Sequence, residues 1–127
     1  MRLPNTKKRE LKRLLAGKML EEYVRSARTN FRRFVAHCWM GPGKFVAGKH
    51  IDGICELVDE ACRLYENGES SNWLVAIPFR HGKTALIGKL FPAYFLARYA
   101  KQEPSVMLTG YGSDLVRDTS EDCRRLI

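Results

Sequence analysis

Long apolar runs are missing from this chain of 127 residues. A membrane-crossing helix needs about 18 or more consecutive apolar residues, and no such run occurs. The basic N-terminus also lacks the apolar stretch of a secretory signal. We therefore expect a cytoplasmic protein without a membrane partner.

Paired metal-binding cysteines are missing as well. The four cysteines, Cys38, Cys55, Cys62 and Cys123, include no C-x-x-C pair, which disfavours a zinc site. Cys55 and Cys62 are two helical turns apart on an apolar face and are interpreted as reduced core thiols. No Ser/His/Asp or Cys/His arrangement that would indicate a nucleophile is visible.

Acidic residues are scarce at the N-terminal end. Residues 1–33 hold 11 Lys/Arg and 3 Asp/Glu, so the +8 net charge of the whole chain lies in this quarter. Such a basic arm predicts a polyanionic partner such as DNA or RNA. A solvated helix end explains the same charge, and the sequence leaves both interpretations open.

Apolar residues at three- and four-residue spacing predict helices in the N-terminal half. One covers residues 6–27, and another carries a stripe from Ile51 to Tyr65 that ends before Gly68. In the C-terminal half, the short apolar runs 73–77 and 105–109 predict buried strands. The apolar segment 85–99 between them predicts a helix that Pro92 kinks or splits.

This order predicts an α/β fold. A strand, a helix and a second strand form a βαβ unit, which implies a parallel sheet with a right-handed crossover. We expect a P-loop NTPase-type sheet of about two strands, preceded by a helical region. The predicted divisions are a basic helical arm (residues 1–29), a helical lead-in (30–72) and a partial P-loop core (73–127).

Residues 78–84 join the first predicted strand to the following helix and have the sequence PFRHGKT. A loop at this place binds phosphate through backbone N–H groups at the positive end of the helix dipole. Lys83 would reach the β/γ-phosphates of ATP, and the Thr84 hydroxyl would ligate Mg²⁺. Ile77 stands where the usual pattern has its first glycine. The candidate cofactor-binding residues are Pro78, Phe79, Arg80, His81, Gly82, Lys83 and Thr84.

Arg80 and Lys83 are the candidate catalytic residues. The Arg80 guanidinium could stabilise transition-state charge, report nucleotide state, or only add positive potential. His81 could touch phosphate or cap the helix. The string Leu57-Val58-Asp59-Glu60 resembles a Walker B motif, but it lies within a predicted helix and precedes the loop, so we interpret it as a decoy.

Three segments together resemble the ATPase domain of large terminase subunits, the DNA-packaging motors of tailed bacteriophages. They are LVAIPFRHGKT (74–84), FPAYFLA (91–97) and VMLTGYGSDL (106–115). Many members of that family carry a loop reading roughly P-P-R-H-G-K-S, followed by F-P-A-x-x-L. Phe79 and Thr84 depart from this loop, both mildly.

The resemblance implies that Gly82, Lys83 and Thr84 bind the phosphates of ATP and Mg²⁺, and that Arg80 serves catalysis or coupling. It makes His50 a weak candidate for the region that contacts adenine. It further implies double-stranded DNA, a portal protein and a small terminase subunit as partners, and a homo-oligomeric ring. The family's Walker B and nuclease residues have no counterpart here, so we expect an N-terminal part of the ATPase domain that does not hydrolyse ATP alone.

Two other functions remain open on the sequence. One is a different P-loop enzyme, helicase-like or a nucleotide kinase. The other is a non-enzymatic nucleic-acid-binding protein that uses its basic helix.

Overall fold

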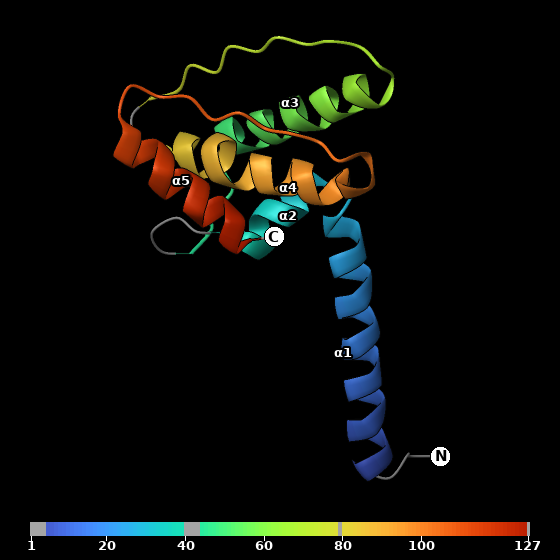
Figure 1. Ribbon diagram of the computed structural model, residues 1–127. Helices are drawn as coiled ribbons and strands as arrows, with labels where there is room; N and C mark the ends of the chain where they lie inside the picture. The colour runs from blue at the N-terminus through green and yellow to red at the C-terminus, as the bar shows by residue number, and fades with distance from the viewer. Residues whose placement is uncertain (1–4, 40–43, 79, 127) are drawn as a thin grey trace.

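The computed structural model of the protein describes residues 5–39, 44–78 and 80–126. Within these ranges the chain forms five α-helices, one π-helical segment and one 3-10 turn. Figure 1 shows α2 to α5 gathered in one body, from which α1 projects with the N-terminus at its far end. The elements are α1 (Asn5–Ala27), α2 (Phe31–Cys38), α3 (Lys49–Glu66), η1 (Thr84–Leu90), α4 (Phe91–Arg98), η2 (Ala100–Gln102) and α5 (Ser113–Arg125).

α1 is rich in Leu, Lys, Arg and Glu, which favour helix formation in the absence of tertiary contacts. It meets the body only near its C-terminal end, where Ala27 is buried. Its larger apolar side chains, such as Leu14, Met19 and Leu20, stay exposed. The helix is therefore held by its own propensity more than by packing.

α3 has the helical stripe that the sequence predicts. Ile51, Ile54, Cys55, Val58 and Cys62 are all buried along one face. After the helix ends, the chain turns through Gly68, whose φ is +73°. The backbone N–H of Glu69 then donates to the carbonyl of Leu64 at 2.9 Å, a pattern that satisfies the last carbonyls of a helix.

η1 and α4 form one continuous helix with a change of hydrogen bonding at Pro92. The backbone N–H of Phe91 donates to the carbonyl of Leu86, five residues earlier, which is the π-helical pattern. Pro92 has no N–H, and its ring clashes with the carbonyl four residues before it, so the turn upstream of proline widens. The helix predicted over residues 85–99 is present, and its hydrogen-bonding pattern changes just before Pro92.

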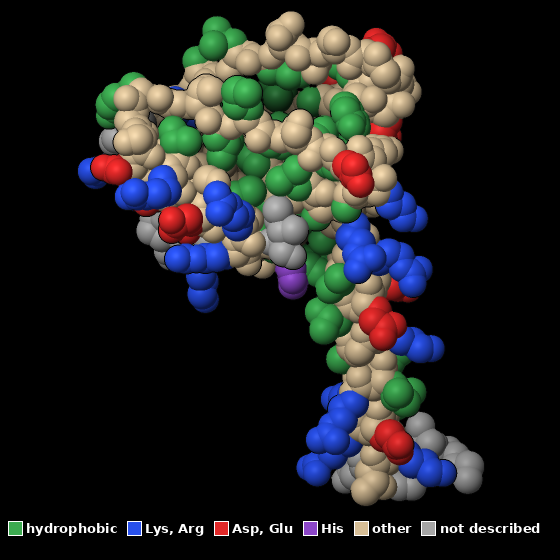
Figure 2. All heavy atoms as spheres, in the orientation of Figure 1, with side chains coloured by type: hydrophobic (Ala, Val, Ile, Leu, Met, Phe, Trp, Pro, Cys, Tyr) green, Lys and Arg blue, Asp and Glu red, His purple; other side chains and the backbone are tan. Residues whose placement is uncertain are grey.

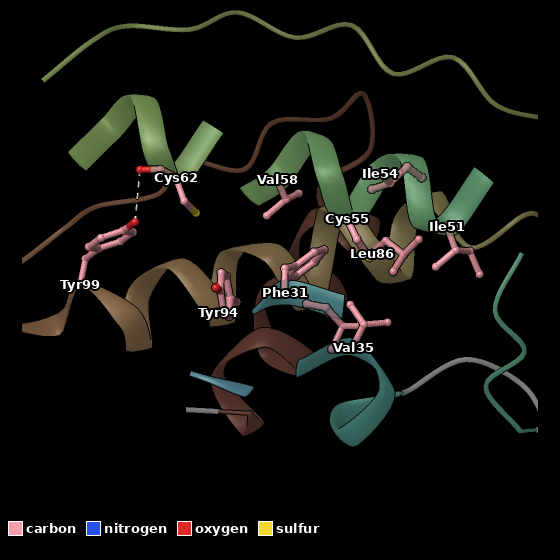
Figure 3. Packing of buried hydrophobic residues seen from close by; sticks show 11 residues of the cluster. Phe31, Val35, Ile51, Ile54, Cys55, Val58, Cys62, Leu86, Tyr94 and Tyr99 are labelled. Atoms are coloured by element: carbon pink, nitrogen blue, oxygen red, sulfur yellow. Dashed lines mark hydrogen bonds between the residues drawn. The ribbon is translucent and has the colours of Figure 1, made fainter. Parts of the chain in front are cut away.

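The core lies between α2, α3 and the η1–α4 helix, as Figure 3 shows. Burial raises the pKa of the Cys55 thiol to about 11 and also raises that of Cys62. Both thiols therefore stay protonated, which confirms their interpretation as core cysteines. The cluster comprises Phe31, Val35, Ile51, Ile54, Cys55, Val58, Cys62, Leu86, Leu90, Tyr94 and Tyr99.

The predicted parallel sheet is wrong. Neither apolar run forms a strand, and no strand occurs in residues 5–39, 44–78 or 80–126. Figure 1 shows both runs as extended segments that travel in the same direction across the helices. The predicted order of extended segment, helix and extended segment is present, but the fold of the described chain is helical.

Neither apolar run is covered on both faces. Val75 and Ile77 pack against the helical core, whereas Leu74 is 94% exposed and Met107 is 87% exposed. A parallel sheet needs neighbouring strands about 4.8 Å apart and cover on both faces. Val75 and Ile77 are the members of run 73–77 that pack against the core, and no residue of run 105–109 is among the described residues that do so.

Candidate functional site

The candidate phosphate-binding loop, residues 78–84, lies between the extended run 73–77 and the start of η1. The chain turns sharply there, because Arg80 has a φ of +62° and Gly82 a φ of +82°. Pro78, Arg80, His81, Lys83 and Thr84 are all exposed. Phe79, the remaining candidate of the loop, lies outside the described residues. Five of the six described residues of the loop are therefore exposed to solvent, and Gly82 is half-buried.

Gly82 is the residue whose identity the loop geometry constrains most. Its carbonyl accepts the backbone N–H of Leu86 at 2.9 Å, which closes the first helical turn. A Cβ atom at this position would meet the ring of Trp39 at 3.4 Å. The positive φ favours glycine at this position.

Lys83 and Thr84 stand at the beginning of the helix. The backbone of Lys83 is already helical, with φ −54° and ψ −50°, and Thr84 is the first residue of η1. The first N–H groups of a helix have no acceptor within it and lie at the positive end of its dipole. Lys83 and Thr84 thus stand exposed at the positively polarised end of this helix.

His50 lies beside the loop. Its ring centroid is 5.6 Å from that of His81, with the two planes at 76°. The weak candidate that the family resemblance indicates is therefore next to the candidate loop in space. Gly48 permits this placement, because a Cβ there would approach the His50 ring to 2.9 Å.

Trp39 is a neighbour of the loop that sequence reasoning missed. Its ring faces Gly82 and packs on Phe45, with centroids 5.3 Å apart. The indole Nε1 is buried and has no hydrogen-bond partner among the described residues. The sequence signal that was available for Trp39 is its place two residues before Gly41, at the end of a helix. Its contact with the loop depends on tertiary packing and has no local signature.

Asp59 and Glu60, the acidic residues of the Walker-B-like string, interact with other residues of the helical body. Asp59 accepts a hydrogen bond from the backbone N–H of Phe31 at 3.2 Å, and Glu60 pairs with Arg63 at 2.5 Å. Both carboxylates lie on α3 and stabilise helices, which agrees with their interpretation as a decoy. In the described part of the chain, no group of three or more His, Cys, Asp or Glu side chains is placed to hold a metal ion.

A partly buried polar cluster joins α3 to the end of α4. The Tyr99 hydroxyl donates to the Glu66 carboxylate at 2.7 Å and to the carbonyl of Cys62 at 3.3 Å. Arg98 donates to the same carboxylate at 2.7 Å and to the Tyr94 hydroxyl at 2.6 Å. Burial raises the pKa of Tyr94 to about 12, against the opposing effect of Arg98, and burial also raises the pKa of Tyr99. Both tyrosines therefore stay neutral at pH 7.

No known protein family, curated protein or solved structure matches the chain. Among the described residues, no helix is both long enough and apolar enough to span a membrane.

Proposed function

We propose that residues 78–84 bind the phosphates of ATP, and that the chain is the ATP-binding part of a phage DNA-packaging motor, a terminase large subunit. The observation that supports ATP binding most directly is Gly82. Its φ of +82° turns the chain immediately before Lys83 and Thr84, which stand exposed at a helix start. The specific family rests on the sequence resemblance.

Each residue of the loop has a distinct role in this proposal. Lys83 neutralises charge on the β/γ-phosphates, and the N–H groups of the first helical turn donate to phosphate oxygens. The Thr84 hydroxyl holds Mg²⁺, which supplies charge neutralisation at the phosphates when it is bound. Arg80, on the same exposed loop, serves catalysis or coupling to DNA movement.

Binding and hydrolysis are separate in this proposal. ATP hydrolysis by this motor class needs a carboxylate for the metal ion and another that activates water. The acids of α3 are committed to Phe31 and Arg63. We therefore propose that the described chain binds ATP, with hydrolysis requiring acidic residues beyond those it places at the loop.

The partners follow from the motor assignment. They are double-stranded DNA, contacted through its backbone and hence largely without sequence preference, a portal protein and a small terminase subunit. The motor acts as a homo-oligomeric ring in the cytoplasm of the host bacterium. All of these partners rest on the resemblance to terminases.

The test is calorimetric titration of the full chain with Mg·ATP. Lys83→Ala is expected to weaken binding at least about tenfold, since it removes a charge-assisted contact. Lys101→Ala is the matched control, because Lys101 is also exposed but lies in η2. Absence of heat with the unaltered chain, or equal loss in both variants, would overturn the proposal.

A second candidate function, binding of nucleic acid without nucleotide, is favoured by α1. Lys7, Lys8, Arg9, Lys12 and Arg13 are all exposed on the part of α1 that projects from the body. Binding of this kind releases counterions and weakens steeply with salt. A DNA titration at two salt concentrations would detect it, and Lys83→Ala should leave it unchanged.

A further inference from the structure

Run 73–77 has the side-chain alternation of a strand that is open on one side. Val75 and Ile77 are half-buried and pack against the core, whereas Leu74 and Ala76 are exposed. Side chains alternate with period two in this way along an extended chain. Leu74 is 94% exposed, so the outer face of the run is uncovered.

The backbone of this run is unpaired as well. No backbone N–H or carbonyl of residues 73–77 is hydrogen-bonded to another backbone group of the described chain. An extended segment with unpaired N–H and C=O groups is a template on which a strand of another chain can pair. Figure 1 shows the run along the upper edge of the body, where such a strand can reach it.

This edge also lacks charged side chains. Residues 70–78 contain no Asp, Glu, Lys, Arg or His. Natural proteins commonly place charges on exposed edges, and these charges prevent pairing with another chain. Figure 2 shows mostly hydrophobic side chains and backbone along this edge of the body. The run therefore lacks the usual protection against pairing with a copy of itself.

The backbone and the composition of the run select a strand as its occupant. A helix has its backbone groups bonded within itself, so it cannot satisfy those of the run. Nucleic acid needs cations at its phosphates, and residues 70–78 supply none. An added strand provides both the backbone partners and the apolar side chains that the run lacks.

We propose that this run pairs with the same run of a second copy, in antiparallel direction and centred on Val75. On the body side, Trp73 meets Ile77 of the second copy, which is an aromatic and β-branched pair of the kind that stabilises sheets. On the outer side, Leu74 meets Ala76 of the second copy. Antiparallel pairing suits a sheet with one face in water. Each copy makes the same contacts about a two-fold axis, and this self-complementarity favours a second copy over an unrelated strand.

Run 105–109 is less suited to this role. Met107 is 87% exposed, but no residue of that run is among the described residues that pack against the core. Pairing of one run with the other run of a second copy would also leave an unpaired run on each copy, and the assembly would extend beyond a dimer. We therefore expect dimers. The paired segments are short, so the interface is small and association should be weak.

Sedimentation velocity of the full chain over a concentration series is the test. The average mass should rise from that of a monomer toward that of a dimer and no further. Leu74→Lys should raise the dimer Kd at least about tenfold, because it removes apolar contacts and places two ammonium groups diagonally across the pair, about 7–8 Å apart. Met107→Lys is the matched control, since Met107 is similarly exposed on the other run. Its Kd should change less than about twofold.

A mixture of variants tests the register. Equal amounts of Leu74→Lys and Leu74→Glu should associate more tightly than either variant alone, because unlike charges then lie diagonally across the pair. The corresponding mixture of Met107→Lys and Met107→Glu should show no such gain. Far-ultraviolet circular dichroism of each variant checks that the helical body is retained. Equal affinity of the Leu74 mixture and its single variants would contradict the proposed register.

Hydrogen exchange followed by mass spectrometry tests the backbone pairing itself. Exchange of the amides of residues 73–77 should slow as the concentration rises, while that of residues 105–109 should not. The pairing uses no side chain of the loop at Gly82, so the proposal stands independently of ATP binding. Lys83→Ala should dimerise like the unaltered chain, which makes failure here distinguishable from failure of ATP binding.

Three results would overturn the proposal. One is a chain that stays monomeric at every concentration, whether or not it binds an unrelated strand peptide. Another is association without slower exchange in residues 73–77. The third is equal weakening of the dimer by Leu74→Lys and Met107→Lys, because general apolar association would then explain the result.

Discussion

The side-chain carboxylate of Asp59 accepts a hydrogen bond from the backbone N–H of Phe31 at 3.2 Å. Asp59 lies on α3, and Phe31 is the first residue of α2. At the same helix end, the side chain of Asn30 accepts the backbone N–H of Arg33 at 3.0 Å. A negative charge at a helix N-terminus is favoured by the dipole. One carboxylate therefore ties the start of α2 to the middle of α3.

Replacement of Asp59 by Ala is expected to lower the free energy of unfolding by about 1–2 kcal/mol, because a helix cap and an interhelical link are lost together. Urea unfolding followed by far-ultraviolet circular dichroism measures the change. Glu60→Ala is the control, since this neighbour makes an exposed ion pair with Arg63 and should cost less. Selective loss of ATP binding in Asp59→Ala, with stability unchanged, would contradict the capping role.

The helices were the predictable part of this fold. The stripe from Ile51 to Tyr65 repeats with helical period, and the structure buries five of its members, from Ile51 to Cys62, on one face of α3. Pro92 likewise acts through a local clash and a missing N–H. Signals of this kind depend on residues a few positions apart, so one sequence contains them.

The two extended runs were wrongly predicted to be strands. An apolar run indicates that side chains are buried, but it does not indicate which segment its backbone pairs with. Val75 and Ile77 are partly buried, as a strand would require, yet helices cover them. The turn of the loop at Gly82 was easier to predict than the sheet, because it depends on the residue types within one short contiguous segment. Trp39 reaches that loop only through the packing of α2, so no pattern near residue 82 indicates it.

Tyr99→Phe is expected to lower the free energy of unfolding by about 1–3 kcal/mol, since the Glu66 carboxylate and the Cys62 carbonyl lose a buried donor. Thermal and urea unfolding both measure this loss. Tyr65→Phe provides the comparison, because Tyr65 belongs to the same aromatic group but is 40% exposed. A loss no larger than that of Tyr65→Phe would show that the Tyr99 hydroxyl contributes little.

The ion pair between η1 and α5 should make the stability of the fold depend on pH in the acid range. Lys89 donates to Asp122 at 2.5 Å, and this hydrogen bond lowers the pKa of Asp122. The folded pKa lies below that of the unfolded chain, so the contribution is present above about pH 4 and is lost as the pH falls through the lowered pKa. Lys89→Met should reduce the loss of thermal stability over this acid range, whereas Lys101→Met should not. Parallel acid profiles for the unaltered chain and Lys89→Met would rule out this origin.

Two glycine substitutions should have opposite effects on stability. Gly82→Ala is expected to destabilise the fold by about 1–2 kcal/mol, because φ is +82° and a residue with a Cβ is strained in this left-handed region. Gly53→Ala lies in α3 with nothing within 4 Å of its new Cβ, and it should stabilise by about 0.5–1 kcal/mol because alanine favours the helix. Urea unfolding of both variants beside the unaltered chain measures the pair. If Gly82→Ala were neutral while Gly53→Ala stabilised, the turn before Lys83 would not require glycine, and the φ of +82° would not constrain residue 82 of the candidate loop.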